Sequence, residues 1–109
     1  MPTSWMLIMY KVVYLPLALN DLREITDYIT DVLKAPKAAI DLVDALDDSI
    51  LKLGQFPYSC RVYQTTQHIE TVYRLMPVKN YLVFYAVHEC EVEIHRIIYA
   101  KMNLEKIMK

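Results

Sequence analysis

Four basic side chains in the second half of the sequence are the main candidates for binding a phosphate or another anion. They are Arg61, Arg74, Arg96 and Lys101. A guanidinium group can donate two parallel hydrogen bonds to a phosphate, whereas an ammonium group supplies a compact positive charge. A structural interpretation stands beside the functional one, because a surface arginine on a strand commonly pairs with a neighbouring glutamate. For Arg96 that partner would be Glu70, across the predicted sheet.

The aromatic and titratable side chains give weaker indications of function than the basic ones. We interpret Tyr81 and Tyr85 as core residues, because they lie in an apolar run, and Tyr99 as a candidate for stacking on a nucleobase. Histidine can exchange a proton near neutral pH, but none of the three here stands in a recognisable acid–base pair, so we favour structural roles for them. These histidines are His68, His88 and His95.

Length and charge limit the classes of function. The chain has 109 residues, which predicts one domain over 1–109, and a formal net charge of -1. Residues 1–56 carry five basic and eight acidic side chains, and residues 57–109 carry seven and five. Any binding of a polyanion must therefore use a local patch on the second half. The alternative is that the acidic residues only form a solvated face.

Glycine and cysteine usage excludes further classes. Gly54 is the only glycine, so the chain cannot form the glycine-rich loops that hold nucleotide phosphates. Cys60 and Cys90 lack metal-ligand spacing, and we expect no metal and no cofactor. The apolar N-terminal stretch is interrupted by Lys11 and lacks the features of a signal peptide. We therefore expect a reduced, cytoplasmic protein with no membrane segment, and a loose tail over residues 1–9.

The spacing of apolar residues predicts an α+β fold. Residues 10–15 read as a strand that ends at Pro16, and apolar side chains then recur at spacings of three and four over 18–34 and again over 36–53. The two helices should fold back as a hairpin, with Gly54 as the C-terminal cap of the second. Three strands follow, over 69–76, 81–88 and 92–99, and residues 103–109 could add a helical turn. The predicted order is β-α-α-β-β-β, with the helical hairpin packed on a small antiparallel sheet.

This order and several short motifs resemble the RelE/ParE superfamily of toxins from type II toxin–antitoxin modules. The motifs are Tyr73-Arg74, Asn80-Tyr81, Val83-Phe84-Tyr85 and Ile94-His95-Arg96-Ile97, and the similarity runs from about Tyr10 to Ile107. The resemblance implies a toxin that is neutralised by a cognate antitoxin in a hetero-oligomer. Its target would be either DNA gyrase or mRNA on the ribosome.

Residues that differ from the family pattern bear on the choice of target. Cleavage of RNA needs cations to stabilise the phosphorane and groups that transfer protons. The resemblance assigns Arg74 and Lys101 to such positions, whereas Arg61, Arg96 and Tyr99 are candidates for target binding on the chemistry of their side chains. Tyr81 and Met102, however, stand where nuclease members carry basic residues. A neutral phenol cannot replace a guanidinium as a charge clamp, which favours inhibition by binding over cleavage. A degenerate member that binds partners without activity is the alternative.

Overall fold

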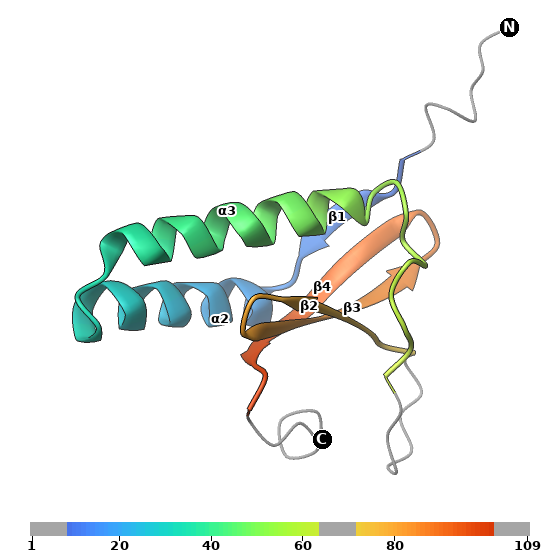
Figure 1. Cartoon of the computed structure of the whole chain (residues 1–109). Helices are drawn as coiled ribbons and strands as arrows, with labels where there is room; N and C mark the ends of the chain where they lie inside the picture. The colour runs from blue at the N-terminus through green and yellow to red at the C-terminus, as the bar shows by residue number, and fades with distance from the viewer. Residues whose placement is uncertain (1–8, 64–71, 102–109) are drawn as a thin grey trace, which may run out of the picture.

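The computed structural model describes residues 9–63 and 72–101 and contains the predicted elements in the predicted order (Figure 1). The expected tail before Met9 and the expected turn over 103–109 fall outside these residues. The bounds are β1 (Lys11–Tyr14), α2 (Pro16–Asp27), the π-helical segment η1 (Tyr28–Val32), α3 (Pro36–Lys52), β2 (Arg74–Val78), β3 (Tyr81–His88) and β4 (Glu91–Tyr99).

The four strands form one mixed sheet in the order β1-β4-β3-β2. Strands β2, β3 and β4 make the predicted antiparallel meander, with two-residue turns at Lys79-Asn80 and Glu89-Cys90. Strand β1, in contrast, pairs parallel to β4, with Lys11 opposite Glu91 and Tyr14 opposite Ile94. The expectation of a wholly antiparallel sheet is therefore corrected for β1. Its partner lies about 80 residues away in the sequence, and no local pattern indicates such a pairing.

The helical hairpin covers one face of the sheet (Figure 1). Each helix begins with a proline, which needs no hydrogen-bond acceptor at that position. The long apolar stripe of α3 buries Leu46 and Ile50 against Tyr85 and Ile94 of the sheet. The helix predicted over 18–34 is continuous, but its last turn widens into η1 before Lys34 adopts a left-handed φ of 55°.

Gly54, the predicted C-terminal cap, directly follows the C-cap residue Leu53, and its φ is not positive. Its carbonyl instead accepts a hydrogen bond of 2.8 Å from the Tyr10 N–H, just before β1. A Cβ atom at this position would lie 3.1 Å from the Tyr10 carbonyl oxygen. Glycine is thus explained by the close approach of two backbone segments.

The central strand β3 is buried on both faces, as its apolar sequence predicts. Tyr85 faces the helices, whereas Phe84 faces the other side and packs with Leu75 and Ile98 in a second, smaller cluster. Among the helices of the described residues, none has the length and apolar character needed to cross a bilayer.

Candidate functional site

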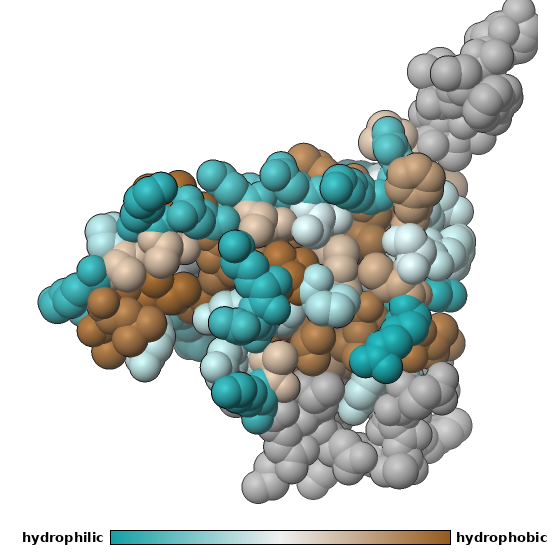
Figure 2. All heavy atoms as spheres, viewed as in Figure 1, coloured by the Kyte–Doolittle hydropathy of each residue, from teal (hydrophilic) through white to brown (hydrophobic). Residues whose placement is uncertain are grey.

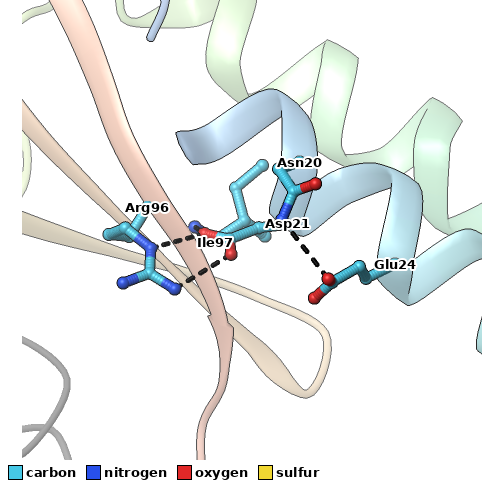
Figure 3. Close-up of polar contacts among 5 residues, drawn as sticks. All are labelled: Asn20, Asp21, Glu24, Arg96 and Ile97. Carbon is cyan, nitrogen blue, oxygen red and sulfur yellow. Dashed lines mark hydrogen bonds and ion pairs between the residues drawn. The ribbon is translucent and has the colours of Figure 1, made fainter. Parts of the chain in front are cut away.

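An acidic residue of α2 closes the free edge of β4 (Figure 3). Strand β1 ends opposite Ile94, so among the described residues the next part of β4 has no strand neighbour on that side. There the buried carboxylate of Asp21 accepts a hydrogen bond of 3.0 Å from the Ile97 N–H. It also accepts bonds of 2.7 and 2.9 Å from Nε and Nη2 of Arg96. One carboxylate therefore satisfies the strand edge and fixes an arginine.

A β-bulge aims Arg96 toward this carboxylate. The register of β3 with β4 shifts between Phe84 and Tyr85, so that His95 is an extra residue on β4. Such a bulge twists the strand and redirects the side chains beside it. The hydrogen bonds with Asp21 raise the pKa of Arg96, because they stabilise its charged form. Glu70, the partner that the sequence suggested, lies outside the described residues.

Arg74 faces the helical side of the sheet and binds a loop of its own chain. It lies directly opposite Tyr85, and residues paired in this way share a face. Its Nη1 donates a hydrogen bond of 2.7 Å to the Cys60 carbonyl, and its guanidinium lies 5.0 Å from the centroid of the Tyr58 ring. Tyr85 adds a hydrogen bond of 2.9 Å from its hydroxyl to the Pro57 carbonyl. Together they hold the segment between α3 and β2.

The basic candidates do not gather at one position, although Arg61 and Arg74 lie on adjoining segments of chain. Arg61 is exposed in the segment that pairs with the outer edge of β2, where its carbonyl accepts a bond of 3.0 Å from the Leu75 N–H. Lys101 is exposed two residues beyond Tyr99. Tyr99 pairs with Tyr81 at the start of β3, four residues before Tyr85. Because Arg74 pairs with Tyr85, the four-residue step from Tyr81 to Tyr85 separates Tyr99 from Arg74 by about 13 Å along the strand direction.

The imidazole of His95 lies in a small polar cluster on the face away from the helices. Its Nε2 is 3.3 Å from Oε1 of Glu93, and its ring packs edge-on against Tyr73 with centroids 5.0 Å apart. His88 is exposed at the end of β3, and His68 lies outside the described residues. Within residues 9–63 and 72–101, no group of His, Cys, Asp and Glu side chains is arranged to hold a metal ion.

A groove of about 830 Å³ runs between the helical hairpin and the far end of the β3–β4 pair. Its helical wall includes Ile25, Tyr28 and Leu33, and its sheet wall includes Tyr81 and Tyr99. Figure 2 shows hydrophobic side chains gathered at the free end of the hairpin. Of the residues that line the groove, Tyr28 and Leu33 are 53% and 54% exposed. This end of the groove offers apolar surface of the kind that binds a partner.

The charges along the groove are ordered. We call the end of the groove where Asp21 pairs with Arg96 its inner end. Together with Glu24, these residues carry two negative charges and one positive charge there. At its outer end lies Lys79, exposed in the β2–β3 turn with a left-handed φ of 54°. A partner segment that fills the groove would therefore meet different potentials at its two ends.

The groove residues were not among the predicted site residues, apart from Arg96 and Tyr99. Asp21 carried a usable signal, because it lies three residues after Ala18 and four before Ile25 and so breaks the buried stripe of α2. A carboxylate on such a stripe needs a buried partner. Tyr28 and Lys79 gave no comparable signal, since one lies on a helix tip and the other in a turn.

The comparisons agree with this architecture. A family model described as "ParE toxin of type II toxin-antitoxin system, parDE" matches residues 12–104. A solved structure titled "Chromosomal ParDE TA system from P. aeruginosa" superposes with a TM-score of 0.68 at 20% identity, and the match covers 85% of this chain and 98% of that one. The search of curated proteins gives no match. The match over residues 12–104 shows that the chain belongs to the ParE toxin family of type II toxin–antitoxin systems.

Proposed function

We propose that this chain is a growth-inhibiting toxin that acts by binding DNA gyrase and does not cleave mRNA on the ribosome. The observation that carries the proposal is the placement of the basic residues. Arg74 is engaged by the Cys60 carbonyl and Arg96 by Asp21, and both lie apart from Lys101. Cleavage of RNA requires several cationic groups around one phosphate. The described residues supply no such cluster, and membership of the ParE family supports gyrase as the target.

In the resting state, the proposed toxin is neutralised by an antitoxin segment that occupies the groove under the hairpin. The apolar walls, with Ile25 and Leu33 on one side and Ile97 on the other, suit the apolar face of such a segment. The proposed location of the toxin is the cytoplasm. There the antitoxin would hold it in a complex, and the released toxin would bind gyrase.

The test is controlled expression of the whole chain in growing cells that lack the adjacent gene. Plasmid supercoiling and mRNA 5′ ends are measured in the same culture. We expect growth arrest with altered supercoiling and intact mRNA, and recovery when the adjacent gene is co-expressed. Codon-phased new mRNA ends would overturn the choice of target. Normal growth with verified folded protein would favour the inactive binding protein instead.

A further inference from the structure

Three tyrosines meet at the outer end of the groove. Tyr81 and Tyr99 pair across β3 and β4, and their rings pack edge to face with centroids 5.6 Å apart. Tyr28 approaches from the hairpin and lines the same groove. Burial raises the pKa of Tyr81, and the nearby phenols of Tyr99 and Tyr28 raise it further. All three tyrosines line the groove, and we name this set of Tyr28, Tyr81 and Tyr99 the tyrosine corner of the groove.

The tyrosine corner is incompletely covered within the described chain. Tyr28 is 53% exposed and Tyr99 is 39% exposed, and Leu33 beside them is 54% exposed. Partly exposed tyrosines that flank a hollow offer a large contact area at a small cost in side-chain entropy. An apolar side chain inserted there would be surrounded by rings, as the central anchors of protein interfaces are.

The positive charge beside the tyrosine corner indicates which kind of partner segment would bind there. Lys79 lines the groove in the turn next to Tyr81, and Lys101 follows Tyr99 by two residues. Of the described residues that line the groove, the acidic ones are Asp21 and Glu24, and both lie at the end that contains Arg96. The outer end is therefore cationic, and an acidic group of a partner would be attracted to it.

We propose that the tyrosine corner is the specificity-determining anchor site for the antitoxin, and that it takes an apolar side chain flanked by an acidic residue which pairs with Lys79. This inference rests on the proposed function, since it names the chemistry of the segment that neutralises the toxin. The partner segment thus has a fixed direction in the groove. Its acidic end lies over Lys79, and any basic residue lies toward Glu24.

The test measures binding of the whole toxin to the purified product of the adjacent gene by isothermal titration calorimetry. The variants are Tyr28→Ala and Lys79→Glu. Their matched controls are Phe56→Ala, a 62% exposed aromatic residue outside the groove, and Lys52→Glu, an exposed lysine at the end of α3. All four positions are on the surface, and far-UV circular dichroism checks that each variant is folded.

We expect Tyr28→Ala and Lys79→Glu each to weaken binding by at least about tenfold, and the controls by less than about twofold. We also expect one acid-to-lysine change in the partner to restore binding of Lys79→Glu. Wild-type affinity in both groove variants would overturn the inference while leaving the proposed function intact. Equal losses of affinity in the groove variants and in the controls would also overturn the inference. Failure of the wild-type toxin to bind at all would overturn the proposed function and the inference with it.

Discussion

The carboxylate of Asp21 on α2 and the guanidinium of Arg96 on β4 are joined by hydrogen bonds of 2.7 and 2.9 Å, although 75 residues separate them in the sequence. The same carboxylate accepts the Ile97 N–H at 3.0 Å. This contact fixes the first helix against the sheet edge where β1 stops. It thereby sets the position of the hairpin that forms one wall of the groove.

Replacement of Asp21 should therefore destabilise the fold strongly. In Asp21→Asn the partly buried Arg96 loses its counter-charge, and removal of one partner of a fully buried pair costs about 3–5 kcal/mol. We expect a loss near the lower value, because Arg96 retains some contact with water. Urea unfolding of Asp21→Asn beside Asp41→Asn measures it, since Asp41 pairs with Lys37 on the surface and its side chain is 56% exposed. Equal stability of the two variants would contradict this role of Asp21.

Arg74 should contribute to stability and not to toxicity. In Arg74→Gln the hydrogen bond to the Cys60 carbonyl and the contact with the Tyr58 ring are lost. We expect the free energy of unfolding to fall by about 1–3 kcal/mol. The matched control is Arg61→Gln, because Arg61 is exposed in the same segment of chain. Growth inhibition by equal amounts of folded protein should be unchanged. A loss of toxicity at unchanged stability would instead support the family-implied role of Arg74 in the active site.

Stability should fall in alkaline solution because of Tyr14. Burial, together with the neighbouring Asp47 carboxylate, raises its pKa from 10.0 to about 12. The folded state thus favours the neutral phenol. Its contribution is fully present below pH 10 and is lost as the pH rises toward 12. The full shift corresponds to at most about 3 kcal/mol.

The measurement is urea unfolding at several pH values between 8 and 12 for the wild type and Tyr14→Phe. The phenylalanine variant cannot ionise, so its stability should decline less over this range. It also lacks the 3.3 Å hydrogen bond to Asp47, which lowers its stability equally below pH 10. Parallel pH profiles for the two proteins would show that Tyr14 does not ionise in this way.

Much of the fold follows from local sequence patterns. The proline that starts each helix, the apolar stripe of α3 and the doubly buried strand β3 all appear in the structure as expected. These features depend on neighbours within a few residues. The pairing of β1 with β4 and the bulge at His95 were not predicted, because both depend on contacts between distant segments.

The site was less predictable than the fold for the same reason. The sequence around a basic residue such as Arg74 or Arg96 is the same whether its side chain binds a phosphate or an oxygen atom of its own chain. Only the register shows that Arg74 lies opposite Tyr85 on the helical face and that Lys101 follows the other end of the meander. The groove itself arises from the overhang of the hairpin beyond the sheet, which no single segment encodes (Figure 1).

A toxin that acts on gyrase, as proposed, should inhibit supercoiling and leave mRNA intact. The most direct measurement adds the purified chain to a gyrase supercoiling reaction and, in parallel, to a translating ribosome extract with a labelled mRNA. We expect dose-dependent inhibition of supercoiling, relieved by the antitoxin, with full-length mRNA throughout. Codon-phased cleavage of the mRNA at toxin concentrations that leave gyrase active would contradict this expectation.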